Sequence, residues 1–186
     1  MNRHINLITL SALCMTAFSA HSGAGEIDAK ISSNSAATEI RHNLQQEFRL
    51  GAGYLYHEGG RHVINLGVHA TGQTAIANLP TTVAIGSKIY YFNDDPIDGT
   101  AVTLGGDVRV NIPEAPGLSA ELGIHYAPSI LSFGDADDMV DTNFQLNYRV
   151  IPKADVSAGY HYQVSEIANK HRTLDEGLFV GVRLHF

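Results

Sequence analysis

The sequence predicts an all-β protein, a small antiparallel β-barrel of about ten strands that follows an N-terminal signal peptide. Three observations lead to this fold class. Short segments in which apolar residues alternate with glycine or polar residues fill most of the chain. Turn-forming residues separate these segments, as in hairpins. No stretch beyond the N-terminal leader approaches the roughly 20 consecutive apolar residues of a membrane helix. At 186 residues, with no break in composition, the chain is expected to form one domain.

The first element is the leader "MNRHINLITLSALCMTAFSA". It has Arg3 and His4 before a mostly apolar run and then small residues, which is typical of a secretory signal peptide. We expect residues 1–20 to be removed, with cleavage between 19 and 24, and residues 25–186 to form the barrel. Cys14, the single cysteine, lies in this leader, so the mature chain has no disulfide.

The strands follow in order. The eight clearest alternating segments are Phe48–Tyr56, Ile64–Thr71, Val83–Tyr91, Val102–Val110, Leu118–Tyr126, Phe144–Val150, Val156–Gln163 and Leu178–Phe186. Two shorter segments, Ile27–Ile31 and Thr38–Ile40, lie on either side of "SSNS". Counting them gives ten strands, and omitting both gives eight. Because the segments follow one another as hairpins, a meander that closes on itself and leaves no exposed edge is the simplest arrangement.

Alternation alone does not say which face points inward. A soluble barrel of the lipocalin type has an apolar interior, whereas a membrane barrel has an apolar exterior. Here the face opposite the apolar residues is rich in glycine, which eases crowding inside a narrow barrel. The glycines of that face are Gly51, Gly53, Gly67, Gly86, Gly105, Gly123, Gly159 and Gly181. This composition favours a polar interior.

Tyrosines on the apolar face also indicate a membrane. Five of them lie near strand ends that point the same way: Tyr54, Tyr56, Tyr91, Tyr126 and Tyr162. A ring of tyrosines suits the membrane interface, where the aromatic body is buried and the hydroxyl stays wet.

The connections alternate between acidic or long segments, such as "SILSFGDADDMVD" and "SEIANKHRTLDEG", and short proline-containing ones, such as "VIPKAD". This difference between the two ends is typical of outer-membrane barrels. "GQTAIANLP" is expected to be a long connection at the short-turn end, which makes it an exception.

The last strand carries a spacing of Gly181, Leu184 and Phe186 that is similar to the C-terminal insertion signal of bacterial outer-membrane proteins, although Phe179 stands where a polar residue is usual. The segments "FRLGAGYLYHEGG", "KIYYFNDDPIDG", "IHYAPSILSFGDAD", "AGYHYQ" and "GLFVGVRLHF" resemble the YfaZ-type family of outer-membrane proteins. The resemblance implies a signal peptide, a small barrel and a location in the Gram-negative outer membrane. It implies no catalytic residues.

The candidate lumen residues are charged or histidine residues on the polar face: Arg49, His69, Lys88, Asp107, Arg109, Glu121, His125, Arg149, His161, Arg183 and His185. They could conduct or select ions, or form an acid–base site. Alternatively they neutralise each other in a structural network, because unpaired charge inside a narrow barrel is costly. Barrels of eight to ten strands are largely filled by side chains, which favours the network.

Other chemistry is less well supported by the sequence. The ten histidines show no tight metal-ligand spacing, so no metal site and no cofactor are predicted. The acidic residues Asp94, Asp95, Asp98, Asp135, Asp137, Asp138 and Asp141 lack the pattern of an EF-hand loop, and solvated charge is preferred to a calcium site. Ser119, Glu121 and His125 share a strand face, but residues six apart on a strand are separated by about 20 Å and cannot form a triad alone.

The functional prediction is a non-enzymatic outer-membrane barrel with a structural or narrow-pore role. The alternatives are a lipid-modifying or hydrolytic outer-membrane enzyme and a soluble secreted ligand-binding barrel. Expected partners are outer-membrane lipid, lipopolysaccharide and the insertion machinery, with the barrel as a monomer. The formal net charge of −7 disfavours nucleic acid.

Overall fold

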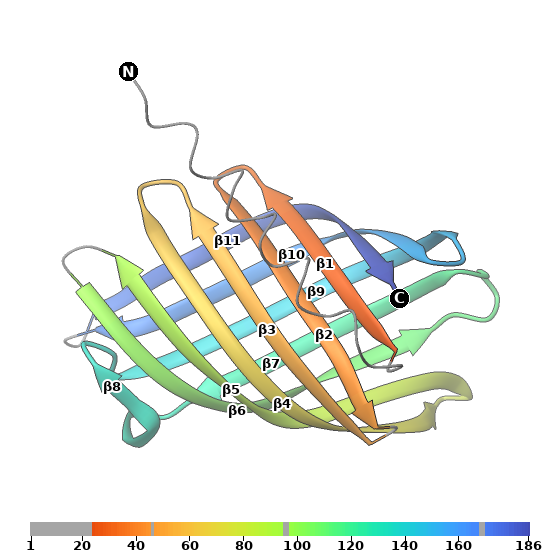
Figure 1. Ribbon diagram of the computed structural model, residues 1–186, viewed down its shortest axis with the longest axis horizontal. Helices are drawn as coiled ribbons and strands as arrows, with labels where there is room; N and C mark the ends of the chain where they lie inside the picture. Colours follow the sequence, from red (N-terminus) through yellow and green to blue (C-terminus); the bar gives the residue numbers. More distant parts are fainter. Residues whose placement is uncertain (1–23, 46, 95–96, 168–169) are drawn as a thin grey trace.

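Figure 1 shows the fold in a computed structural model. The structure describes residues 24–45, 47–94, 97–167 and 170–186. The predicted signal peptide, residues 1–20, lies outside this part of the chain. No helix among the described residues is long and apolar enough to cross a membrane.

The described chain consists almost entirely of antiparallel strands. In order they are β1 (Gly25–Ser32), β2 (Ser35–Gln45), β3 (Phe48–His57), β4 (Arg61–Ile76), β5 (Leu79–Asp94), β6 (Ile97–Asn111), β7 (Leu118–Ala127), the 3-10 turn η1 (Ser129–Leu131), β8 (Ser132–Gly134), β9 (Asp138–Ile151), β10 (Ala154–Ile167) and β11 (Lys170–His185). Ten strands form a closed ring, which β1 and β11 complete, and the short β8 adds to β6 outside the ring order. The predicted ten-stranded barrel is confirmed. The alternative of eight strands is wrong, because β1 and β2 pair along their length as full members of the ring.

The barrel has two ends. The turn end, on the right in Figure 1, carries the connections 77–78, 112–117 and 152–153. The loop end, on the left, carries 33–34, 58–60 and 128–137. Most loop-end connections are shorter than the sequence predicts. In particular, "SEIANKHRTLDEG" lies largely within the paired strands β10 and β11.

The predicted long connection "GQTAIANLP" is also a hairpin. β4 continues to Ile76 and β5 begins at Leu79, joined by Ala77 and Asn78. Both turn residues have positive φ, 51° and 66°, as a two-residue type I′ turn requires. Its residues 72–76 are exposed on both faces. A strand segment that is exposed to solvent on both faces does not require apolar residues at alternate positions. The alternation pattern therefore does not reveal these strand ends.

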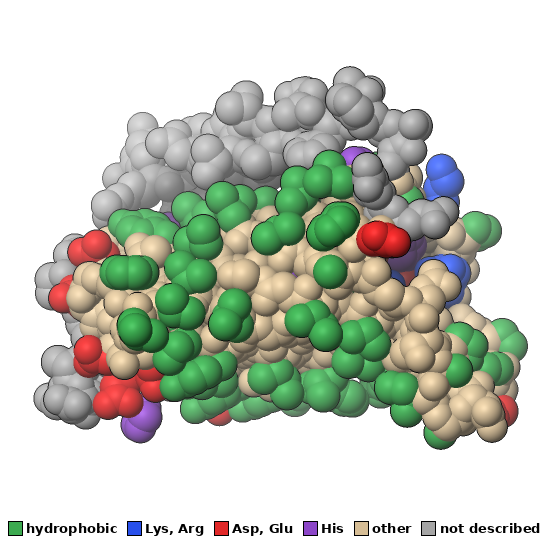
Figure 2. All heavy atoms as spheres, turned by 90° about the horizontal axis from the view of Figure 1, so that it is seen from below, with side chains coloured by type: hydrophobic (Ala, Val, Ile, Leu, Met, Phe, Trp, Pro, Cys, Tyr) green, Lys and Arg blue, Asp and Glu red, His purple; other side chains and the backbone are tan. Residues whose placement is uncertain are grey.

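The surface of the barrel is apolar and the interior is charged. Exposed large apolar side chains occur on strands all around the ring, and in Figure 2 they extend along the barrel wall while acidic side chains gather at the loop end. Buried residues include Asp28, Arg41, Glu121, Asp141 and Arg183. A barrel in water has the opposite distribution, so this is the arrangement of a membrane barrel. The polar groups of the strand backbones pair within the closed ring, as the hydrocarbon layer requires.

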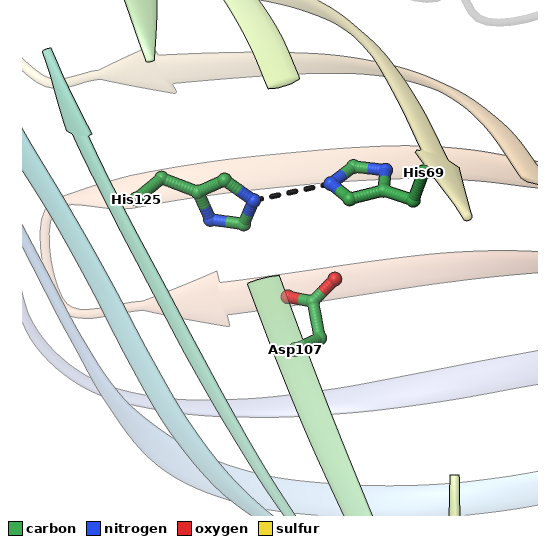
Figure 3. A group of neighbouring side chains, drawn as sticks. All are labelled: His69, Asp107 and His125. Carbon is green, nitrogen blue, oxygen red and sulfur yellow. Dashed lines mark hydrogen bonds between the residues drawn. The ribbon is translucent and has the colours of Figure 1, made fainter. Parts of the chain in front are cut away.

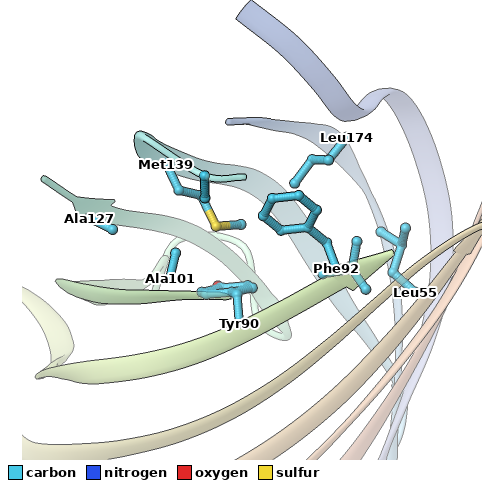
Figure 4. Close-up of a cluster of buried hydrophobic side chains, with 9 residues drawn as sticks. Leu55, Tyr90, Phe92, Ala101, Ala127, Met139 and Leu174 are labelled. Atoms are coloured by element: carbon cyan, nitrogen blue, oxygen red, sulfur yellow. The ribbon is translucent and has the colours of Figure 1, made fainter. Parts of the chain in front are cut away.

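An apolar cluster fills the lumen at the loop end (Figure 4). Phe92, Met139 and Leu174 are fully buried there, from β5, β9 and β11. Leu55, Val63, Tyr90, Ala101, Ala127 and Ala136 complete the cluster. Ala136 comes from the connection 128–137, so this loop helps to close the loop end of the barrel.

Candidate functional site

The lumen is the candidate functional site, and the predicted lumen residues fall into three groups within it. Arg109, Glu121 and Arg183 belong to a cluster of arginines and carboxylates toward the turn end. Arg149 and His185 lie at the turn end itself. The remaining residues, Arg49, His69, Lys88, Asp107, His125 and His161, lie around a polar cavity or next to its lining.

Glu121 on β7 is the centre of the first group. Its carboxylate accepts hydrogen bonds from Arg41 Nη1 at 3.1 Å, Arg183 Nη1 at 2.8 Å and Arg109 Nη2 at 2.8 Å. Arg41 lies on β2, which is halfway around the ring of ten strands from β7. The Arg41–Glu121 pair therefore spans the full width of the lumen.

Two further carboxylates complete this arginine cluster. Asp28 Oδ2 accepts from Arg183 Nη2 at 2.7 Å and from Arg41 Nη2 at 3.2 Å. Glu26 Oε1 lies 2.9 Å from Arg41 Nε. With Arg183, Arg41, Asp28 and Glu121 all buried, each charge depends on its partners for stabilisation.

A polar cavity lies between the arginine cluster and the apolar cluster. It has about 910 Å³ of atom-free space, including the part that opens to solvent. Lys30, Glu39, Lys88, Asp107 and Asn143 are among its lining residues. The cavity is therefore charged on several sides, and Leu55, Val63 and Tyr90 of the apolar cluster form part of its lining.

His161 lies at the loop-end side of this cavity in a chain of hydrogen bonds. Its Nδ1 is 2.9 Å from Asp175 Oδ2 and its Nε2 is 2.8 Å from Asp141 Oδ1. The hydroxyl of Tyr90 donates to the other oxygen of Asp141. Asp141, expected in an acidic loop, is instead an inward residue of β9. Of the other acidic-loop residues, Asp95 lies outside the described residues.

The side chains of His69 and His125 contact each other on the inner face of the barrel wall, although they come from β4 and β7. Their Nε2 atoms are 3.1 Å apart, and Figure 3 shows both imidazoles pointing toward each other with Asp107 beside them. Asp107 Oδ2 also accepts from Arg49 Nη2 at 2.9 Å. In the described part of the chain, these three residues are the one group whose possible ligand atoms all lie within 4.8 Å of one another. Sequence reasoning missed this pairing, because the two histidines are 56 residues apart and separated by two strands.

The turn-end group is more open. Arg149 Nε donates to Asp155 Oδ1 at 2.8 Å, and His185 Nε2 is 2.8 Å from Asp155 Oδ2. The Arg149 side chain is 49% exposed, in contrast to the buried arginines of the cluster.

The five predicted girdle tyrosines lie on the outer face near the loop end. Tyr91 and Tyr126 are 44% and 47% exposed, and Tyr162 is partly exposed. Tyr54 and Tyr56 pack beside His62, and the Tyr54 hydroxyl is 2.8 Å from His62 Nδ1.

The predicted insertion-signal residues lie on or next to β11, at the seam with β1. Leu184 and Phe186 point outward and are about half exposed, whereas Gly181 faces Ser157, and a Cβ there would lie 2.7 Å from Ser157 Oγ. The backbone of Phe186 exchanges two hydrogen bonds of 2.9 Å with Gly25.

Sequence reasoning missed several lumen residues: Glu26, Asp28, Lys30, Glu39, Arg41, Asp141 and Asp175. Those on β1 were detectable, because Glu26, Asp28 and Lys30 alternate with the apolar Ile27, Ala29 and Ile31.

The hydrolase alternative is not supported by the positions of its candidate residues. Glu121 is bound by three arginines and His125 faces His69. These contacts orient the Glu121 carboxylate toward arginines and the His125 imidazole toward His69, and none of them orients either side chain toward Ser119.

Comparison with known proteins finds one matching family and several solved structures that are similar in fold at low sequence identity. The family model described as YfaZ precursor matches residues 4–186. No curated protein sequence matches the chain significantly. The KdgM porin in complex with disordered oligogalacturonate is similar in structure at 10% identity, with 88% of this chain and 99% of that chain covered and a TM-score of 0.47. The NanC porin is similar at 9% identity, with 89% and 99% covered and a TM-score of 0.41. The outer-membrane channel DcaP of Acinetobacter baumannii is similar at 11% identity, with 86% and 54% covered and a TM-score of 0.42.

Proposed function

Because the chain belongs to the YfaZ precursor family, we propose that it is a non-enzymatic barrel of the bacterial envelope whose lumen is closed by its own side chains. Its location is the bacterial outer membrane, where the apolar exterior contacts lipid. Its role on this proposal is structural, and it does not provide an open pore.

The observation that carries the proposal is the arginine cluster across the lumen. Arg41 and Glu121 come from opposite sides of the ring, and Arg183 and Asp28 fill the space beside them. A permeating ion would have to displace these paired, buried charges and would meet the apolar cluster as a second barrier. Breaking a buried ion pair costs several kcal/mol, about 3–5 kcal/mol when one partner is removed.

The partners follow from the same surfaces. The apolar belt would contact outer-membrane lipid, and the loop end would face lipopolysaccharide and the medium, because outer-membrane barrels place their longer connections outside. The closed ring needs no second chain, which favours a monomer, and β11 is the segment expected to engage the insertion machinery.

Conductance in planar lipid bilayers tests the closed lumen. We expect the purified wild-type protein to give no steady open current. The triple variant Arg41→Ala, Phe92→Ala, Met139→Ala removes a side chain from the arginine cluster and two from the apolar cluster, and should conduct. The matched control is Ile64→Ala, Leu66→Ala, Val68→Ala, which removes apolar volume from the exterior and should stay silent. A steady single-channel current from the wild-type protein would contradict a closed lumen.

The enzyme alternative has its own test. Lipid A from cells with and without the protein should have the same mass spectrum. A protein-dependent change in acylation would favour a lipid-modifying enzyme.

A further inference from the structure

The His69–Asp107–His125 group is built on a row of glycines. His69 on β4 pairs with Gly86 on β5, Gly86 pairs with Gly105 on β6, and Gly105 pairs with His125 on β7. The two histidines thus stand at the ends of one row across four strands, with only glycine between them. In a flat sheet, three strand spacings amount to about 14 Å. Here the curvature of the wall and the length of the imidazoles bring the Nε2 atoms to 3.1 Å.

The glycines are required for this approach. A Cβ at Gly86 would lie 2.7 Å from the Cα of His69, and one at Gly105 would lie 2.6 Å from the Cα and 2.9 Å from Cδ2 of His125. A side chain at either position would collide with the backbone of the neighbouring strand, and at Gly105 it would also collide with the ring of His125. A third glycine, Gly123, faces Asp107, because a Cβ there would lie 2.7 Å from Asp107 Oδ1. The backbone therefore leaves room for these three side chains to converge.

The converging atoms form a known type of donor set. Two imidazole nitrogens and one carboxylate oxygen bind Zn²⁺ or another first-row divalent ion, with solvent at the remaining position. With metal–nitrogen distances of about 2.0–2.1 Å, two tetrahedral nitrogen ligands lie about 3.3 Å apart. The observed separation of 3.1 Å is close to this value. We propose that His69, Asp107 and His125 bind a divalent transition-metal ion of the zinc class in the lumen wall.

The surroundings allow such an ion to reach the site but limit its affinity. Asp107 and His125 line the polar cavity, part of which opens to solvent, so a hydrated ion can reach them without crossing the whole lumen. Arg49 donates to Asp107 at 2.9 Å, and Lys88 lies on β5 two residues beyond Gly86, so two cations lie on the neighbouring strands. Without metal, the histidines satisfy each other by one N–H to N hydrogen bond. A bound ion would replace that bond and compete with Arg49 for Asp107.

Titration of the purified mature protein with Co²⁺ and Zn²⁺ tests the site. The protein must carry no polyhistidine tag, and refolding in detergent is checked by heat-modifiable gel migration. We expect one equivalent of Co²⁺ to give the intense visible absorption of a low-coordinate nitrogen and oxygen site, and Zn²⁺ to displace it. His69→Gln and His125→Gln keep side-chain polarity but remove a ligand. Each should weaken binding by more than the loss of a residue that only supports a ligand, which costs about 10–100-fold. Arg49→Gln frees Asp107 and should tighten binding. His57→Gln, at a partly exposed histidine of the loop end, is the matched control and should bind as the wild type does.

Two results would overturn the site: a folded wild-type protein that binds no Co²⁺, or binding that survives both His69→Gln and His125→Gln. Both results are independent of conductance, so the metal site can fail while the closed lumen stands, and the reverse.

Discussion

Glu121 shows how much a single residue holds in this barrel. Its carboxylate binds three arginines, one from the neighbouring strand β6 and two from β2 and β11, which lie farther around the ring. The sequence places Glu121, Arg109 and Arg183 on the inner face, because strand parity alone decides that. It does not show which side chains meet across the lumen, because the contacts depend on the register and curvature of the closed ring.

Glu121→Ala should destabilise the folded barrel by about 3–5 kcal/mol, because three arginines lose a buried counter-charge. The measurement is the free energy of unfolding by urea in lipid vesicles. The control is Arg149→Ala, since Arg149 is 49% exposed and a solvated ion pair is worth about 0–1 kcal/mol. Equal losses for the two variants would show that the cluster is not a structural centre.

The turn residue Ala77 offers a second measurement at this scale. Its φ of 51° is unfavourable for a residue with a Cβ, so Ala77→Gly should stabilise the hairpin by up to about 1 kcal/mol. Ala75→Gly, in the adjoining strand, should instead cost about 0.5–1 kcal/mol. Thermal unfolding in detergent would rank the two variants, and the opposite order would refute the turn geometry.

Among the elements, β11 is the strand whose two faces differ most clearly. Val180, Val182 and Leu184 point outward, and Arg183 between them is fully buried. This alternation is legible in the sequence, and it led directly to the strand. The extension of β4 and β5 toward their turn is not predicted by the pattern, because residues 72–76 of β4 are exposed on both faces. Periodicity reports a strand only where its two faces meet different surroundings.

Val182→Arg places a charge on the lipid face of β11 and should cost about 2–4 kcal/mol of stability in a bilayer. Ile151→Arg, at the turn end of β9, should cost only about 0–1 kcal/mol, because charge is tolerated near the interface. Unfolding in vesicles gives both values. A similar loss of stability at the two sites would mean that Val182 and Ile151 do not differ in their depth within the bilayer.

For the whole molecule, the sequence predicts the closed antiparallel ring and its apolar exterior, because both follow from repeated local patterns. The apolar cluster at the loop end was not predicted. Phe92, Met139 and Leu174 stand on the inner face, where the pattern otherwise alternates polar, and their meeting depends on strands from three parts of the chain. Contacts that close a lumen are therefore the least accessible part of such a fold.

The orientation of the barrel can be measured with single cysteines, since Cys14 is the only cysteine of the chain and lies in the predicted leader. Phe133→Cys stands in β8 at the loop end, and Glu114→Cys stands in the turn-end connection 112–117. On intact cells, a membrane-impermeant maleimide should label the first and not the second. Labelling of the second alone would reverse the orientation.

The inverted distribution of polar and apolar side chains also bears on how this chain can fold at all. In water, collapse would gather the apolar outer faces of the strands together, and that is the wrong side of the sheet for the native ring. A compact state reached in an aqueous compartment would thus compete with the barrel and would not lead toward it. The chain must therefore stay unfolded and protected from collapse until lipid is present, because only lipid stabilises the apolar outer faces in their native position.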